Sequence, residues 1–440
     1  MLDDKNIFNF TLSLYCIFSV FCIVRIVAIY SKSRRLDLLL LDPSLYFNVS
    51  SIFYLIFPGL LYLIQGYTFN LLNGPLSGFE NFEVSSMSLF MLEGIIFSII
   101  FNYVFRGFNQ ILISRKVQTV GFNFKVLLNL SFAYLLIVFI IYLLEFIDVI
   151  PKSNSYLDSY AQRSSLSIGA NYLINFIYSL SSLLLYGVIA TALSANDFGK
   201  SKIILIIILA VFLFKYDFTG SRSGIVWCFL IFYVYYNKYV KQLSLLKTLS
   251  FLILFAIFFE FLGAYRNDGF ELLFSSDNTN GGEMLTVFSN AVNLKSQLDN
   301  GMLDQPFQLN FYTLYHYIPS FLLPFEKLEY SSWYVKTFFS DYRDAGGGNM
   351  FGFLAELQLF NNNIFIILLG PIIIALSLHK CFKFIYCKSL YGFNLLVYVI
   401  LLLSMNNIFR LSFFGVYFSF SSYGFPLLIL FVITKISRKL

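Results

Sequence analysis

Long apolar blocks, separated by short polar seams, make up nearly all of the chain from Phe8 to Ile436. The apolar runs are continuous rather than alternating, which is typical of membrane-crossing helices and not of the strands of a barrel. A spanning helix needs about 20 mainly apolar residues, and on this criterion the chain has about eleven spans. The predicted spans are Ile7–Ile29, Leu45–Leu63, Ser88–Phe105, Val126–Ile147, Tyr172–Leu193, Ile203–Phe218, Ile225–Tyr236, Thr248–Ala264, Ile364–Leu378, Phe393–Ser404 and Phe413–Ile433.

The composition points to the same class. Hydrophobic residues make up 58% of the chain and charged residues only 12%, whereas a soluble domain has about 25% charged residues. So few charges cannot cover a water-facing surface, so the bilayer is the solvent of this chain. We therefore predict an all-α polytopic membrane protein, with residues 1–440 forming a single integral membrane domain. The five cysteines are scattered and make no CxxC pair, so we expect neither a disulfide framework nor a metal site.

Basic residues set the predicted orientation. Lys and Arg gather in the seams after the first, third, fifth, seventh and ninth spans and at the C-terminus. Since such residues stay on the cytoplasmic side of a membrane, these seams face the cytoplasm and the alternate seams face outward. The same rule explains the net charge of +6, which therefore does not call for nucleic acid as a partner.

One long hydrophilic interruption, from Tyr265 to Asn363, separates the eighth span from the ninth. We predict that residues 265–363 form a large outer, periplasmic loop, and that the chemistry of the protein is there. His316 is a candidate base, although a lone His among aromatic residues is more often structural. Glu356 lies on an apolar segment that re-enters the membrane, and it serves either as a base or as the partner of an Arg.

Several cations lie on the predicted outer surface, where the rule on basic residues does not explain them. They are Lys215, Arg222, Arg266, Arg343 and Arg410. Arg222 is framed by Ser221, Ser223 and two glycines in a tight turn. Arg binds phosphate oxygens through two parallel hydrogen bonds, and small neighbours let backbone N–H groups approach the same anion. The cluster suits a lipid diphosphate. The alternative for each Arg is a head-group contact or a local ion pair.

Motifs for other chemistries are missing from the sequence. It contains no P-loop, no GxGxxG, no HExxH and no DxD, which argues against ATP, a nucleotide sugar or a metal cofactor. With Gly-Ser-Arg-Ser-Gly at 220–224, Ile318-Pro319 through Pro324, and Gly346–Glu356, the chain resembles the bacterial O-antigen and capsule repeat-unit polymerases of the Wzy family. Members of that family often carry an Arg after the Ile-Pro pair, where this chain has Ser320.

The resemblance implies glycosyl transfer at the periplasmic face of the bacterial inner membrane. A growing glycan on undecaprenyl diphosphate would be moved onto a new lipid-linked repeat. Arg222, Arg266 and Arg343 would stabilise the leaving diphosphate, and His316 or Glu356 would act as the base. The implied partners are the undecaprenyl-diphosphate-linked oligosaccharide, membrane lipid and a chain-length regulator protein.

Two other functions fit the same layout. One is an O-antigen ligase or another lipid-linked glycosyltransferase, which differs from a polymerase in its acceptor. The other is a transporter, a flippase for the same lipid-linked oligosaccharide. Flippases generally carry more charge inside their spans, and in this chain Glu93 is the clearest charge within a predicted span.

Overall fold

The computed structural model describes residues 4–33, 40–65, 84–108, 124–147, 149–150, 168–195, 198–215, 223–244, 247, 250, 283–299, 333–334, 336–337, 352–359, 364–387, 392–405, 407–410 and 426–434. Within these residues all the regular secondary structure elements are helices. The α-helices are α1 (Asp4–Ser33), α3 (Pro43–Ser51), α4 (Phe57–Gln65), α5 (Val84–Val104), α7 (Phe124–Phe146), α9 (Ile168–Leu193), α10 (Phe198–Lys215), α11 (Ser223–Tyr235), α13 (Glu283–Asp299), α17 (Gly352–Gln358), α18 (Ile364–Cys387), α19 (Gly392–Ser404) and α20 (Asn407–Arg410).

Seven of the described helical segments are long and apolar enough to cross a membrane. They are Asn6–Ser31, Pro43–Leu63, Ser85–Val104, Phe124–Phe146, Leu173–Leu193, Phe365–Tyr386 and Phe393–Arg410. The protein is thus an all-helical, multi-pass membrane protein, as the sequence indicates. The count of eleven and the orientation in the bilayer stay predictions. The predicted sixth and seventh spans form α10 and α11, and the eighth, Thr248–Ala264, lies outside the described residues except for Ser250.

The second predicted span is a continuous helix with one irregular turn. Asp42 caps its start by accepting a hydrogen bond from the backbone N–H of Ser44 at 2.8 Å, as Asp does at many helix N-termini. Between α3 and α4, residues Ile52–Ile56 form a π-helical turn. Pro58, the second residue of α4, comes shortly after this turn. Proline has no N–H to donate to the carbonyl four residues back, so an irregular, widened turn directly before it is expected.

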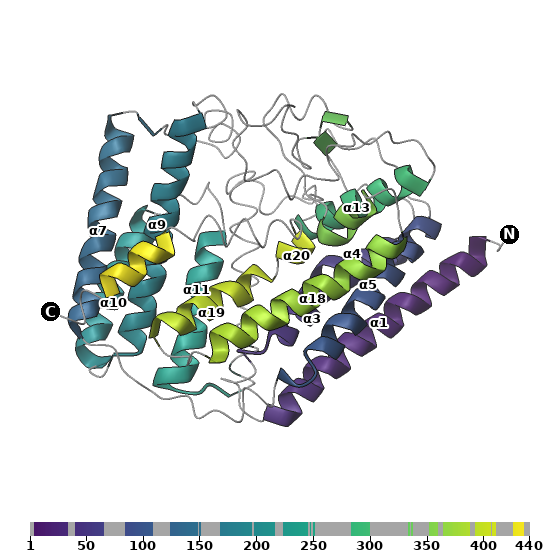
Figure 1. Ribbon diagram of the computed structural model, residues 1–440, viewed down its shortest axis with the longest axis horizontal. Helices are drawn as coiled ribbons and strands as arrows, with labels where there is room; N and C mark the ends of the chain where they lie inside the picture. The colour runs from purple at the N-terminus through teal and green to yellow at the C-terminus, as the bar shows by residue number, and fades with distance from the viewer. Residues whose placement is uncertain are drawn as a thin grey trace.

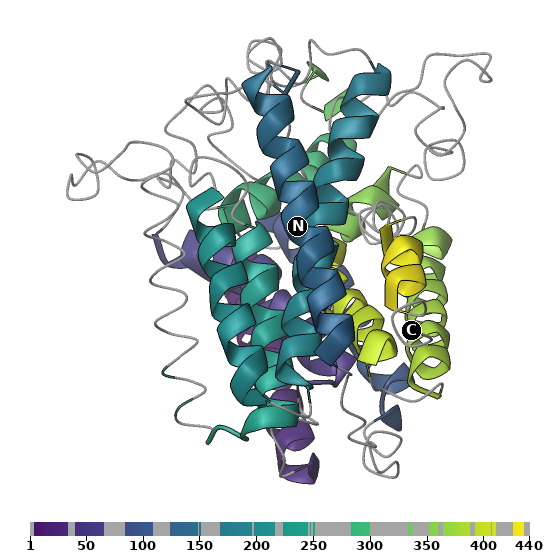
Figure 2. The ribbon, with the colours of Figure 1, turned by 90° about the vertical axis from the view of Figure 1, so that its left-hand side faces the viewer.

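The helices form two groups that share a core. In Figure 1, α7, α9, α10 and α11 stand nearly upright on the left, while α1, α5 and α18 run obliquely to the right. Within the groups, α9 packs against α7, α10 and α11, and α5 packs against α1 and α18. Figure 2 shows α7, α9 and α10 side by side from the end of the molecule. α19 contacts both α9 and α18 and so connects the two groups.

The lipid-facing surface is apolar. Large hydrophobic side chains are exposed along α1, α7, α10 and α18, among them Phe10, Phe132, Phe214 and Phe365. In water such a surface would be costly, but in a bilayer these side chains meet acyl chains. One large hydrophobic cluster fills the interior and includes residues from both groups, and two small clusters lie apart from it.

Two helices of the predicted outer loop belong to this interior. α13 lies beside α4 and α5 in Figure 1 and packs against both. α17 is shorter, and all seven of its residues are buried. The polar interruption of the sequence therefore contains helices that pack onto the membrane bundle. The sequence predicts this for the apolar segment that carries Glu356, but not for α13.

Candidate functional site

The candidate site is centred on the place where α17 packs against its neighbours, which we call the seat of α17. α17 packs against α5, α13, α18 and α20. A helix of seven residues is too short to be stable by itself, so these neighbours determine where it lies. A glycine lets it approach α18 closely, because a Cβ added to Gly370 of α18 would lie only 2.7 Å from Cδ2 of Leu357.

Glu356, the predicted base, lies in α17 and is 3% exposed. The sequence predicts a partly desolvated carboxylate there, and the structure confirms the burial. Burying a carboxylate is costly unless it is paired, hydrogen-bonded or protonated. Its depth in the molecule therefore makes Glu356 a functional candidate rather than a surface charge.

Arg410, a predicted diphosphate ligand, is the last residue of α20. It is half-buried, and α20 packs directly against α17. The structure thus brings two of the predicted site residues, Glu356 and Arg410, onto neighbouring elements, although they are far apart in the sequence.

A polar network lies next to α17, and its members come from three segments. Nζ of Lys295 in α13 lies 3.5 Å from Oε1 of Glu93 in α5 and 3.2 Å from Oδ1 of Asp299. Gln358 in α17 donates from Nε2 to Oε2 of Glu93 at 2.7 Å. Ser86 of α5 donates to Oδ2 of Asp299 at 3.1 Å. The network therefore joins the first half of α5 to α13 and α17.

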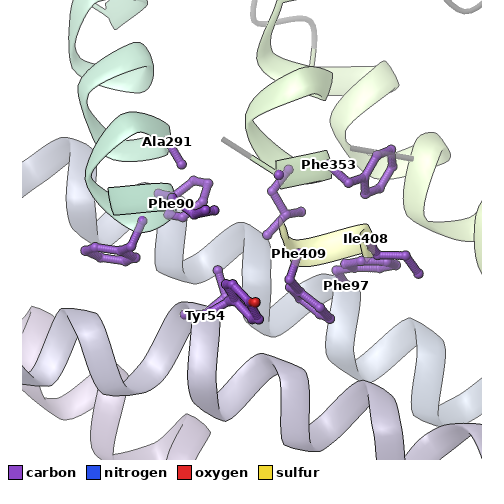
Figure 3. Close-up of a pocket in the computed structure, with 12 residues that line it drawn as sticks. Tyr54, Phe90, Phe97, Ala291, Phe353, Ile408 and Phe409 are labelled. Carbon is purple, nitrogen blue, oxygen red and sulfur yellow. The ribbon is translucent and has the colours of Figure 1, made fainter. Parts of the chain in front are cut away.

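A small pocket, lined mainly by apolar side chains, lies between the same elements (Figure 3). Its lining includes Phe90 and Phe97 of α5, Phe353 of α17 and Phe409 of α20. The rings are in contact: the centroids of Phe97 and Phe353 are 5.5 Å apart, and those of Phe97 and Phe409 are 6.2 Å apart. One wall of the site is therefore aromatic.

Two further predicted site residues stand at the ends of helices. Lys215 is the last residue of α10 and Ser223 is the first of α11. Both helices pack against α9. The predicted Arg222 turn is the connection between these two ends, so it joins helices that share a neighbour.

The other predicted site residues lie outside the described part of the chain. They are Ser221, Arg222, Arg266, His316 and Arg343. Their roles, and a gathering of cations at one mouth of the bundle, remain predictions. Among the described residues, no group of three or more His, Cys, Asp or Glu side chains is arranged to hold a metal ion.

Sequence reasoning missed Lys295, Asp299 and Gln358. A local signal was present for α13, because apolar residues recur with helical spacing between Val287 and Leu294, and Lys295 and Asp299 are an i,i+4 pair. No local signal connects Gln358 to Glu93, since the two are 265 positions apart.

Comparison with known proteins finds no relative of this chain. No protein-family model, no curated protein and no solved structure matches the chain, so a function must be inferred from the residues and contacts described above.

Proposed function

We propose that this protein polymerises lipid-diphosphate-linked oligosaccharide repeat units at the outer face of the bacterial inner membrane. The observation that carries the proposal is the packing of α17 against α20. It puts the buried Glu356 and the half-buried Arg410 on adjacent elements that pack onto the membrane bundle. Transfer of a glycan from a lipid diphosphate needs both kinds of group, a base and a cation.

The reaction exchanges one glycosidic bond for another. The bond between the anomeric carbon of the growing chain and the diphosphate oxygen breaks, and the oxygen leaves with the electron pair. A hydroxyl of the terminal sugar of the incoming repeat forms the new bond to that carbon. Its proton passes to a base, for which Glu356 and His316 are the candidates. Undecaprenyl diphosphate is the leaving group.

Charge develops on the diphosphate as it leaves. Fixed guanidinium groups stabilise such charge strongly in a water-poor site, and Arg binds phosphate oxygens in a bidentate geometry. In this proposal Arg222 is the main ligand, and Arg266, Arg343, Arg410 and Lys215 assist it. Ser221 and Ser223 complete the turn around the same anion.

The lipid-facing exterior supports a lipid-linked substrate. Seven apolar helical segments are suited to hold the protein in a membrane, the phase in which the polyprenyl tail of such a substrate also lies. The contact between the rings of Phe97 and Phe353 makes one wall of the site apolar. A protein held in the bilayer favours a lipid-linked donor over a soluble one.

The Glu93–Lys295 pair favours a second candidate, a transporter for the same class of lipid. Ionisable residues inside membrane spans often mark transport pathways, and Glu93 lies within the span Ser85–Val104. A ligase would use the same donor chemistry with a different acceptor, and no described contact distinguishes it from a polymerase.

A deletion strain distinguishes the three functions. Its surface glycan, separated on a gel, should carry single repeats and no long chains if the protein is a polymerase. Loss of every attached repeat, with polymer still present on the lipid carrier, indicates a ligase. Accumulation of lipid-linked repeats on the cytoplasmic face indicates a transporter. Complementation with the intact gene should restore the wild-type ladder.

A further inference from the structure

We propose that Glu93 and Lys295 are positioning residues that hold α17, through Gln358, in the seat where Glu356 is buried. This inference rests on the proposed function for the role of Glu356. The contact itself joins three segments: α5, α13 and α17. Glu93, Lys295 and Gln358 have no role in the polymerisation chemistry described above.

The charges explain why the contact is specific. The side chain of Lys295 is 4% exposed and that of Glu93 is 12% exposed. An ammonium or carboxylate buried to this degree must find a partner of opposite charge. α13 is therefore held in the one register on α5 that brings Nζ of Lys295 to Oε1 of Glu93. Asp299, one turn further along α13, contacts the same ammonium at 3.2 Å and so reinforces that register.

Gln358 transmits this register to α17. Its Nε2 group bonds Oε2 of Glu93, the second oxygen of the carboxylate that Lys295 contacts. The other end of the amide, Oε1 of Gln358, is buried and has no hydrogen-bond partner among the described residues. Leaving a buried acceptor unsatisfied is unfavourable. The amide is thus oriented by the Glu93 carboxylate and not by competing donors.

Glu356 and Gln358 are two residues apart on the same short helix. Because α17 spans only two turns, a shift at Gln358 moves Glu356 by a comparable distance. Misplacing a catalytic group by about 1 Å can lower a rate by about a hundredfold. The ion pair therefore acts on the reaction through the position of Glu356, without contact with the substrate.

A charge swap provides the decisive variant. Lys295→Met leaves Glu93 and Asp299 without their shared cation, and removing one partner of a buried pair is strongly unfavourable. Combining Glu93→Lys with Lys295→Glu restores an opposite pair at the same place. Asp299→Asn is included in this background, because the carboxylate of Asp299, 3.2 Å from Nζ of Lys295 in the native protein, would otherwise face the new carboxylate at position 295. Oε1 of Gln358, which has no partner among the described residues, would then accept from the new ammonium. A purely packing-based role predicts no such rescue.

The position of α17 can be read without measuring activity. Ala355 is fully buried in α17, and Ala355→Cys is a small change. In membranes, we expect the introduced thiol to be protected from a membrane-impermeant maleimide in the otherwise native protein. The native chain, with its own five cysteines, gives the background. When Lys295→Met is added, the labelling rate of the introduced thiol should rise by at least about tenfold, since loss of a buried partner shifts equilibria by more than that.

The matched control is Lys202→Met. Lys202 lies in α10 and is exposed, so its loss should leave the introduced thiol protected. In the charge-swapped background that thiol should again be protected, and the glycan ladder lost with Lys295→Met should return. This combination supports the inference. If the thiol stays protected with Lys295→Met, or if the swapped protein is inserted and abundant but its thiol is labelled, the inference is wrong.

A milder variant covers the case in which Lys295→Met fails to insert. Gln358→Leu keeps the size of the side chain and the ion pair, and it removes only the bond to Glu93. Faster labelling of the Ala355→Cys thiol in that variant supports the inference, and unchanged labelling contradicts it. Should labelling follow the ion pair while a deletion strain still makes long chains, the positioning of α17 is supported and the proposed function fails.

Discussion

Gly352 starts α17 directly against the backbone of Phe409, so that a Cβ on Gly352 would collide with the carbonyl oxygen of Phe409. Gly352 also has a φ of 71°, in the left-handed region that residues with a Cβ rarely adopt. Both features require glycine at this position. The close contact joins α17 to α20 and therefore joins the segments that carry Glu356 and Arg410.

Replacing Gly352 should disturb the whole site. Gly352→Ala adds a steric clash with backbone that cannot rotate away, as well as a left-handed conformation that costs about 1–2 kcal/mol in a residue with a Cβ. We expect a lower melting temperature in detergent and loss of activity. Gly107→Ala is the control, because an added Cβ there meets no atom within 4 Å. Equal melting temperatures for the two variants would show that the seat of α17 tolerates the change.

Arg222→Ala should abolish polymerisation while the protein stays inserted and abundant. Loss of one group that stabilises developing charge typically lowers a rate by about 100- to 1,000-fold. The measurement is the length distribution of surface glycan from a complemented deletion strain, with the protein level checked by immunoblot. Arg106→Ala, at an exposed arginine after α5, is the control and should keep the full ladder. Full-length glycan with Arg222→Ala would remove this residue from the site.

Glu356→Gln tests the proposed base. The substitution keeps size and hydrogen bonding but cannot take the proton of the sugar hydroxyl, so turnover should fall by about 100-fold or more. Membranes containing the variant would be assayed with purified lipid-linked repeats, following chain extension over time. Glu145→Gln is the matched control, because Glu145 contacts Tyr178 in the α7–α9 pair, away from α17. If the Glu356→Gln protein extends chains at the wild-type rate, His316 becomes the leading candidate.

The orientation can be tested with two exposed lysines. Lys336 lies in the predicted outer loop and Lys241 follows α11 in a predicted inner seam, and both are exposed. In intact spheroplasts, Lys336→Cys should react with a membrane-impermeant maleimide, and Lys241→Cys should react only after the membrane is permeabilised. The opposite pattern would put residues 265–363 in the cytoplasm and would exclude a periplasmic reaction.

Asp42 gives the protein a pH-dependent stability. Burial is the main cause that raises the pKa of its carboxyl to about 6, against the lowering effects of its bonds to Ser44 and of Arg25. The folded state therefore binds the proton more tightly than the unfolded state. This contribution to stability is complete below the unfolded pKa and is lost as the pH rises through about 6, by about 3 kcal/mol in all.

Asp42→Asn should remove that dependence, since Asn also caps helices well and carries no charge. Melting temperatures in detergent would be compared across the range from about pH 4 to 7. The wild-type protein should lose stability relative to the variant as the pH increases. Parallel curves for the two proteins would mean that the Asp42 carboxyl titrates normally.

Individual residues show which features of the structure local sequence patterns predict. The apolar runs predicted α1, α5, α7 and α9 to within a few residues, because a helix satisfies its own backbone in lipid and its length is set by the bilayer. The buried position of Glu356 was also predictable, since its neighbours Phe353, Leu354 and Leu357 are apolar. Such features depend only on nearby residues, and so a sequence contains them.

Pairing between distant segments was not predictable in this way. Lys295 belongs to a helix of low hydropathy that the sequence assigns to the outer loop, yet it lies buried beside Glu93. Hydropathy describes how a segment partitions between water and lipid, and α13 is polar enough to suggest water. It is buried because α5 and Tyr334 provide partners for its polar groups, and such partners come together only once the chain has folded.

By itself, the sequence determined that this protein is helical, that it spans a membrane and where its long polar interruption lies, because transfer into lipid is a sum over adjacent residues. Only the tertiary structure decided that α13 returns to the bundle, that Gln358 bonds Glu93, and that Glu356 and Arg410 lie on touching helices. Those outcomes depend on matching charge, size and backbone between segments that have no common signal along the chain.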